Sequence, residues 1–386
     1  MSGCSIHHFR TIDRPLSPEE MEEIDSWSSR FSPTSTGVTY IYHYGSFKQS
    51  VNTVFPKYFD AMLHINNWGT KRLLFRLPKD IVDRRTLSRY ENSNGEISLG
   101  FWKANDYIIL DLQFDDEHGG GWLDEDHYSI DRLVPLREEI LNGDYRSLYL
   151  GWLMVQQNVF DYEDEYEEEW EETEEGALLP PIPANLQQLT AAQKYLMEAF
   201  DIEENLVKAA ATFSPNTQQQ APNYRQLITL LSDKEKDDFL IRFAAGEKRT
   251  DVQLRQRLEA LGGGKTSIQT GQSPPWARLL ELSDEIETAT AIELSKQRAA
   301  AHAKKMEELR SQKAELWKNA ESQALRFNAS GYDQATKIII QLKQVADYEN
   351  NQRAFEQHLG EFITPFIRRP ALIRRLRDNG LLSIKG

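Results

Sequence analysis

The segment between residues 114 and 127 carries the densest set of side chains that could bind a metal ion. It reads FDDEHGGGWLDEDH, so carboxylates and imidazoles stand on both sides of a run of glycines. Oxygen ligands suit Mg²⁺, Mn²⁺ and Ca²⁺, and glycines let a chain wrap closely around an ion. The candidate ligands of this divalent-metal site are Asp115, Asp116, His118, Asp124, Asp126 and His127. The spacing matches no EF-hand loop, and a solvated surface loop is the alternative interpretation.

No other pattern identifies a catalytic nucleophile or a cofactor. The 8 histidines are scattered, and no serine stands in a G-x-S-x-G context. The glycine-rich stretch 261–267 (LGGGKTS) has Glu259 where a phosphate-binding loop needs its first glycine, so it indicates a helix end and a linker. His43 and His64 stand among apolar residues, which favours buried or boundary positions. The catalytic residues stay unassigned, and we expect no cofactor other than a metal.

Two groups of basic residues could contact a partner. In NWGTKRLLFRLP the side chains of Lys71, Arg72 and Arg76 follow Trp68, and a spacing of four puts the two arginines on one face of a strand. We expect either a surface for an anionic partner or a solvent-facing polar side. A second cluster of arginines lies at 368–377, where nucleic acid and a charged helix face are the two alternatives.

An acidic run dominates the charge of the chain. Residues 161–175 (DYEDEYEEEWEETEE) hold eleven carboxylates and no basic residue, whereas the whole chain has a net charge of −15. Blocks of like charge repel and stay disordered, which suits a spacer between domains. The aromatic residues Tyr166 and Trp170 within the run favour a second role, as a docking peptide for a basic groove of a partner.

Composition indicates a folded protein of a reducing compartment. The chain has 386 residues, 40% of them hydrophobic, which is enough for two or three folding units. Its single cysteine, Cys4, excludes an internal disulfide and a zinc finger built on cysteines. We find neither a signal peptide nor an apolar stretch long enough to span a membrane, so we expect a cytoplasmic protein without a membrane partner.

The N-terminal 160 residues predict an α+β domain. Stretches rich in β-branched and aromatic residues predict strands at 38–44, 71–77, 96–102 and 106–114, the last two as a hairpin. Apolar spacings of three and four predict the helices, which we place at 17–27, 50–67, 130–142 and 144–158. The first of these helices begins with a capping box, Ser17 followed by Glu20.

From residue 161 onward, the only secondary structure that the sequence predicts is helical. We divide it into an acidic, proline-containing linker at 161–185, a small helical subdomain at 186–262, a flexible linker at 263–275 and a helical arm at 276–386. Within the subdomain we expect helices at 189–213, 223–245 and 250–261. The predicted fold class is an α+β domain followed by an all-α region with a long helix and a helical hairpin.

The helical arm contains a candidate coiled-coil seam. Residues 276–327 lack glycine and proline and are rich in strong helix formers, so we expect one helix over most of that span. Met306, Leu309 and Leu316 approximate a heptad stripe, which Lys313 interrupts. The stripe needs a partner, either a second copy of the chain or the C-terminal helices folded back on it.

Two stretches resemble known bacterial families. Residues 58–78 (YFDAMLHINNWGTKRLLFRLP), with TIDRPLSPEEM upstream and LTAAQKYLMEAF downstream, resemble a widespread family of uncharacterised bacterial proteins over the first 200 or so residues. Residues 331–378 are similar to the helical tail of some SWIM-type zinc-finger proteins, but the cysteine ligands of the finger have no counterparts. The first resemblance implies a bacterial source, and neither implies an activity.

These observations favour a protein that binds another protein, or itself through the long helix, as an adaptor without enzymatic activity. A long amphipathic stripe in need of a partner carries this expectation. A metal-dependent hydrolase or nuclease at residues 115–127 is the alternative. A nucleic-acid-associated factor is the second alternative, although the acidic net charge argues against it.

Overall fold

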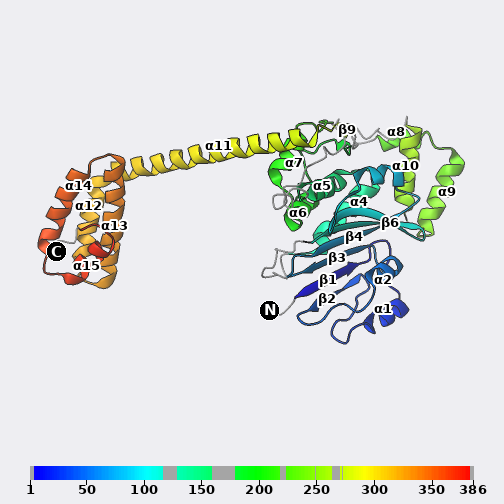
Figure 1. Ribbon diagram of the computed structural model, residues 1–386, viewed down its shortest axis with the longest axis horizontal. Helices are drawn as coiled ribbons and strands as arrows, with labels where there is room; N and C mark the ends of the chain where they lie inside the picture. The colour runs from blue at the N-terminus through cyan, green and yellow to red at the C-terminus, as the bar shows by residue number, and fades with distance from the viewer. Residues whose placement is uncertain are drawn as a thin grey trace, which may run out of the picture. The chain divides into compact units, whose positions relative to one another are not determined.

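The computed structural model shows an α+β unit followed by a helical unit, as the sequence predicts (Figure 1). The compact units are Met1–Glu287 and Thr288–Gly386, and the long helix α11 (Trp276–Ser311) crosses the boundary between them. The structure describes residues 4–115, 128–158, 179–217, 223–247, 249–262, 270–271 and 273–382.

A seven-stranded antiparallel sheet forms the frame of the N-terminal unit. Its strand order is β2-β1-β3-β4-β7-β6-β5, and β6 and β7 form the predicted hairpin around Asn105, whose φ is 52°. The strands are β1 (Ser5–Arg10), β2 (Gly37–Tyr42), β3 (Ala61–Asn66), β4 (Lys71–Pro78), β5 (Asn92–Asn94), β6 (Ile97–Ala104) and β7 (Tyr107–Phe114).

Helices bury both faces of this sheet. Alternate residues of β4 point to opposite faces, so Leu73 and Phe75 join one core while Leu74 joins the other. The first core also contains residues of α4 (Ile130–Leu141), α5 (Arg146–Gln157), α6 (Ala191–Ala199) and α7 (Glu204–Ala211). The second core lies under α1 (Pro18–Asp25) and α2 (Val51–Tyr58). The prediction that one side of β4 faces solvent is therefore wrong, because both faces of this strand contribute residues to a core.

The prediction of a helix at 50–67 is correct as far as Tyr58 and wrong beyond it. Helix α2 ends there, and Ala61–Asn66 forms β3, which pairs with β1 and β4. Since β3 is buried on both faces, Met62 and Ile65 do not show the alternation of a half-exposed strand. The capping box at the start of α1 is confirmed, because Ser17 and Glu20 exchange both of its hydrogen bonds.

A group of three helices packs on the sheet near the end of β4. The helices are α8 (Tyr224–Ile228), α9 (Asp233–Ala244) and α10 (Thr250–Leu261). Helix α10 holds the group in place, because Val252 joins the first core and the Gln256 side chain donates to the carbonyl of Ile81 at 3.2 Å. The remaining short elements are α3 (Arg84–Leu87), a 3₁₀ turn at Ser88–Tyr90, and the paired strands β8 (Ile182–Pro183) and β9 (Thr270–Gly271).

The C-terminal unit has its own core. Helices α12 (Lys313–Ala324), α13 (Ala329–Tyr348), α14 (Gln352–Ile363) and α15 (Pro370–Asp378), with a 3₁₀ turn at Thr364–Phe366, bury a cluster that includes Ala335, Ile339 and Leu372. The long helix predicted at 276–327 breaks at Gln312. The chain then folds back, so Met306 is buried and Leu316 packs on this core, while Leu309 is half-buried.

Among the described residues, no helix combines the length and the apolar character that crossing a membrane would require.

Candidate functional site

Most of the predicted metal ligands lie outside the described residues. Asp115 is described, and its Oδ1 accepts a hydrogen bond from Thr70 Oγ1 at 3.0 Å. Asp116, His118, Asp124, Asp126 and His127 fall in residues 116–127, for which the structure gives no placement. In the part of the chain that is described, no three His, Cys, Asp or Glu side chains gather where they could hold a metal. The metal site stays a prediction.

The basic residues predicted to contact a partner form ion pairs with other residues of the same chain. The Lys71 ammonium pairs with Asp201, and the Arg72 guanidinium holds Asp111 through two hydrogen bonds of 2.8 and 2.6 Å. Arg76 is buried against Asp60. Only Trp68, in the turn between β3 and β4, is open to solvent, with 55% of its surface exposed. Tyr166 and Trp170 of the acidic run lie outside the described residues.

A buried ion network centres on Asp60. Its Oδ1 accepts hydrogen bonds from Nε and Nη2 of Arg76 at 3.0 and 2.7 Å, and its Oδ2 accepts from the backbone N–H of Ile12 and Asp13 at 2.7 and 3.0 Å. The fully buried Arg137 lies 3.7 Å from Asp60 Oδ1. Burial alone would raise the pKa of Asp60, but the two arginines and the two N–H groups outweigh it, so the net pKa is lowered.

The network extends to the three-helix group. Asp13 Oδ2 accepts hydrogen bonds of 2.9 Å from both Arg137 and Arg249, and Arg249 directly precedes α10. The ring of Tyr107 lies under the guanidinium of Arg249 at 5.4 Å. These charges join the end of β1, the start of β3, β4, α4 and α10. We interpret the network as structural, because each charge in it faces an opposite one.

Two histidines that lie far apart in the sequence line the same pocket. His7 of β1 and His64 of β3 are direct neighbours in the sheet, and their rings stack at 4.0 Å with an interplanar angle of 5°. Ser5 Oγ lies 3.3 Å from His7 Nε2 and 3.1 Å from His64 Nε2. Sequence reasoning missed this site, because only the pairing of β1 with β3 reveals it. The pocket measures about 460 Å³ and is also lined by Cys4, His43, Tyr44, Phe47 and Trp68.

The electrostatics of this histidine pocket favour binding over acid–base catalysis. Burial lowers the pKa of His64 to about 4, with a smaller contribution from Arg72, and it lowers the pKa of His7 further, aided by His64 and then His8. Both imidazoles are therefore neutral at pH 7. A general base works best with a pKa near the operating pH, so the contact between Ser5 and His64 does not amount to an activated nucleophile.

The buried histidines predict that stability falls in mild acid. Because their folded pKa values lie below the unfolded value of 6.5, the unfolded chain binds more protons between pH 6.5 and about 4. The free energy of unfolding should drop by about 1.4 kcal/mol per pH unit for each titrating histidine in this window. In His64→Gln, urea titrations at pH 7 and pH 5 should differ less than in the wild type. The exposed His358, replaced by Gln, is the matched control, and equal pH dependence in all three proteins would contradict the prediction.

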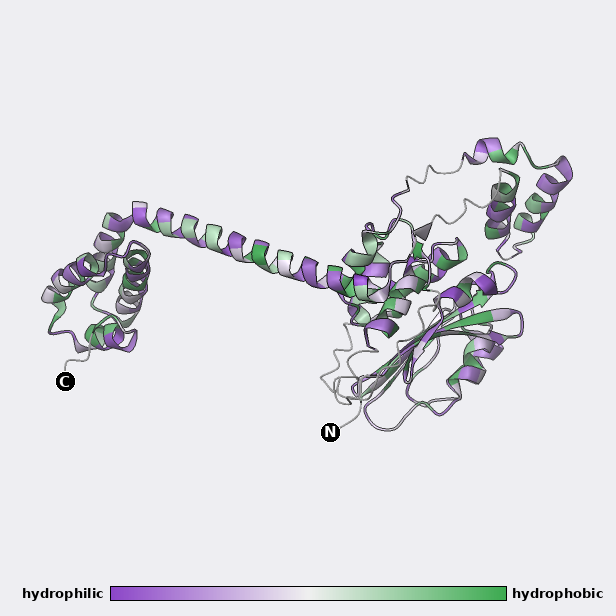
Figure 2. Cartoon of the chain, turned by 45° about the horizontal axis from the view of Figure 1, so that its top comes forward, coloured by the Kyte–Doolittle hydropathy of each residue, from purple (hydrophilic) through white to green (hydrophobic). Residues whose placement is uncertain are grey.

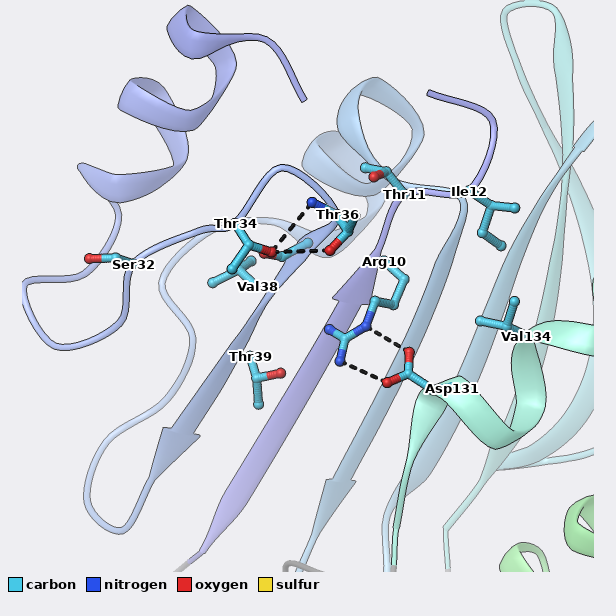
Figure 3. A pocket seen from close by; sticks show the side chains of 11 residues that line it. Arg10, Thr11, Ile12, Ser32, Thr34, Thr36, Val38, Thr39, Asp131 and Val134 are labelled. Carbon is cyan, nitrogen blue, oxygen red and sulfur yellow. Dashed lines mark hydrogen bonds and ion pairs between the residues drawn. The ribbon is translucent and has the colours of Figure 1, made fainter. Parts of the chain in front are cut away.

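A second pocket lies between the start of α4 and the loop before β2 (Figure 3). It measures about 550 Å³ and is lined by Thr34, Thr36 and Thr39 together with Arg10. Figure 3 shows that Asp131 holds the guanidinium of Arg10 through two hydrogen bonds, of 2.8 and 3.2 Å. This pairing neutralises Arg10, so the pocket is not built as an anion site.

The arginine cluster at the C-terminus forms mostly local contacts. Arg375 Nε donates to Asp333 Oδ1 of α13 at 2.6 Å, and Arg374 pairs with Asp378 one turn further along α15. The guanidinium of Arg369 lies over the ring of Phe327 at 4.4 Å. These contacts fit a charged helix face that fastens α15 to its neighbours.

A surface of exposed apolar side chains lies on α8 and α9, where Figure 2 shows apolar residues on the outer helices of this group. Six large apolar residues between Tyr224 and Phe243 expose between 38% and 67% of their surface. We call this set the α8–α9 surface: Tyr224, Ile228, Leu230, Leu240, Ile241 and Phe243.

No protein family, curated protein or solved structure matches this chain. The two resemblances given above rest on the quoted residues alone, and they bring no activity to the chain. Its function has to be inferred from its own surfaces.

Proposed function

We propose that this chain is a non-enzymatic interaction protein that binds another protein through the α8–α9 surface. The observation that carries the proposal is the exposure of the apolar residues on α9. Helix α9 runs over 12 residues without a single buried side chain, although Leu240, Ile241 and Phe243 are large and apolar. Large apolar side chains that are exposed together on one helix are a candidate binding site, since exposed apolar patches on proteins mark interaction sites.

The packing of the three-helix group supports this proposal. Its helices meet over a small interior, which includes Leu231 and Leu258, and α10 alone supplies a residue to the first core. Helices α8 and α9 thus cover little of their own apolar surface. A partner that covered Leu240 and Ile241 would remove from water the large apolar side chains that are most exposed on α9.

The charge of the surface indicates the chemistry of the partner. Residues 223–247 carry four basic and five acidic side chains, so the surface is close to neutral. Arg242 already pairs with Glu247 at 2.8 Å, and Lys236 with Asp233 at 3.0 Å. We infer that the partner presents a complementary apolar patch and that binding depends weakly on salt. A nucleic-acid partner would predict the opposite, a steep loss of affinity with salt.

The proposal predicts that Leu240→Asp/Ile241→Asp abolishes capture of the partner. Central apolar residues of an interface cost about 1–2 kcal/mol or more when they are lost, so the pair should weaken binding at least about tenfold. The measurement is affinity purification of the full-length tagged protein from its native cells, followed by quantitative mass spectrometry. It is carried out at salt concentrations of about 0.15 M and about 0.5 M, the first of which is physiological.

Ile367→Asp supplies the matched control, because Ile367 exposes 72% of its surface and lies in the C-terminal unit. The partner should be recovered with the wild type and the control at both salt concentrations and be lost with the double variant. Equal recovery from all three proteins, or loss of the partner at the higher salt, would contradict the proposal.

The metal-dependent hydrolase remains a second candidate, and five of its six predicted ligands lie outside the described residues. It requires stoichiometric metal in the purified protein and its loss in Asp116→Ala/His118→Ala, whereas the interaction protein requires neither. As the place of action we propose a reducing cytoplasm, which suits a chain whose one cysteine is Cys4.

A further inference from the structure

Among the described residues, none buries the middle of α11. Every residue from Glu287 to His302 is exposed, and Ile292 exposes 51% of its surface. A helical stretch of this length is marginally stable in water when nothing packs against it. Pairing with another helix would stabilise it.

The residues of α11 follow a heptad pattern through this exposed span. Positions separated alternately by three and four residues form one seam, which consists of Leu282, Glu285, Ala289, Ile292, Lys296, Ala299, Ala303 and Met306. The two ends of the seam already pack within the chain, because Leu282 contacts the first core and Met306 is buried. Between them, the exposed seam runs from Glu285 to Ala299.

Two charged residues occupy this otherwise apolar seam, Glu285 and Lys296. Glu285 has one exposed ion-pair neighbour, Arg278, at 3.5 Å. Across the described part of the chain, no side chain forms an ion pair with Lys296. A charge at a seam position costs stability unless it meets its opposite, and it thereby selects the register of a coiled coil.

One alignment of two α11 helices joins these charges. In an antiparallel pair whose two-fold axis passes between Thr290 and Ala291, Glu285 of each copy faces Lys296 of the other. The same register places Ala289 opposite Ile292, which is the pairing of a with d positions that antiparallel coiled coils use. A parallel pair would instead place each glutamate and each lysine against its own kind.

The charges along α11 favour the same direction. Between residues 281 and 293 every charged side chain is acidic, and between residues 294 and 305 every charged side chain is basic. An antiparallel partner therefore lays its basic half along this acidic half. The acidic set is Glu281, Asp284, Glu285, Glu287 and Glu293, and the basic set is Lys296, Arg298, Lys304 and Lys305.

We propose that α11 pairs with α11 of a second copy of the chain as an antiparallel coiled coil. The exposed overlap from Glu285 to Lys296 is about 18 Å long at 1.5 Å per residue, and Ala289 and Ile292 are its apolar seam residues. Such a short seam gives a dimer whose population rises with protein concentration. The pairing uses a surface separate from α8 and α9, so it goes beyond the function proposed above.

The test is sedimentation equilibrium of the full-length protein over a range of concentrations. The wild type should pass from monomer to dimer. Lys296→Glu should weaken the dimer at least about tenfold, and Glu285→Lys/Lys296→Glu should restore it, because the exchanged charges meet again in the same register. Lys318→Glu, at an exposed lysine of α12 outside both charge sets, is the matched control and should stay within about threefold of the wild type, as expected for an exposed charge.

Each remaining outcome overturns the proposal. A wild type that is monomeric at every concentration excludes the dimer, and a dimer that Lys296→Glu leaves intact excludes this seam. Loss of the dimer in Lys296→Glu without rescue by the double exchange excludes the pairing with Glu285. Circular dichroism of each variant verifies that the helices persist. Leu240→Asp/Ile241→Asp should leave the dimer unchanged, so failure of the dimer and failure of the proposed partner site are separate results.

Discussion

Replacing Asp60 by Asn should lower the free energy of unfolding by about 3–5 kcal/mol, the cost of leaving a buried charge without its partner. Arg76 and Arg137 are both buried beside this carboxylate, and neither can reach water to recover its hydration. The amide of Asn keeps the size of the side chain but removes the negative charge. Urea unfolding followed by circular dichroism measures the change.

Asp131→Asn is the matched control for this substitution. Asp131 also forms a two-bond contact with an arginine, Arg10, but 62% of its side chain is exposed. Exposed pairs contribute about 0–1 kcal/mol, so the control should change stability little. A loss below about 1 kcal/mol in Asp60→Asn, no larger than that of an exposed pair, would show that the buried arginines do not depend on this carboxylate.

The Asp60 contribution should also respond to pH differently from the histidine pocket. Because the folded pKa of Asp60 is lowered below its ordinary value of 3.8, its stabilisation is present at neutral pH and is lost only as the pH falls through the folded pKa. The loss of stability that His7 and His64 cause begins at a higher pH, because it starts as the pH falls below 6.5. Acid titration should therefore separate the two effects.

Local patterns in the sequence predict most of the elements correctly. The capping box at Ser17 marks the start of α1, and the paired strands around Asn105 form the expected hairpin. The spacing of apolar residues fails where a strand is buried on both faces, because Met62 and Ile65 then mimic a helix. The long helix breaks at Gln312, after which α12 shares a core with α13, a contact that lies outside any local window.

The candidate sites depend on contacts between distant residues, so the sequence reveals less of them. His7 and His64 stack because β1 and β3 pair, and Asp13 meets Arg249 because α10 packs near the end of β4. An apolar stripe on a helix likewise shows that another element must pack against the helix, but it does not show which segment or which protein supplies that contact. Met306 is buried by other residues of the chain, whereas Leu240 remains 65% exposed among the described residues.

The second large effect is expected in the C-terminal unit, from Ile339→Ala. Ile339 is fully buried in the middle of α13, in a core that shares no residue with the two cores of the N-terminal unit. Deleting its buried methyl and methylene groups should cost about 2–5 kcal/mol. In a unit of this size, a loss of that order lowers the melting temperature by roughly 10 °C or more.

Differential scanning calorimetry of the full-length protein measures this prediction. Since each unit has its own core, the wild type should show two transitions, and Ile339→Ala should lower one of them while leaving the other in place. Ile367→Ala, at a side chain that is 72% exposed, is the control and should shift neither transition. If both transitions moved together in Ile339→Ala, the units would unfold as one cooperative body, and the separation of their cores would not extend to their stability.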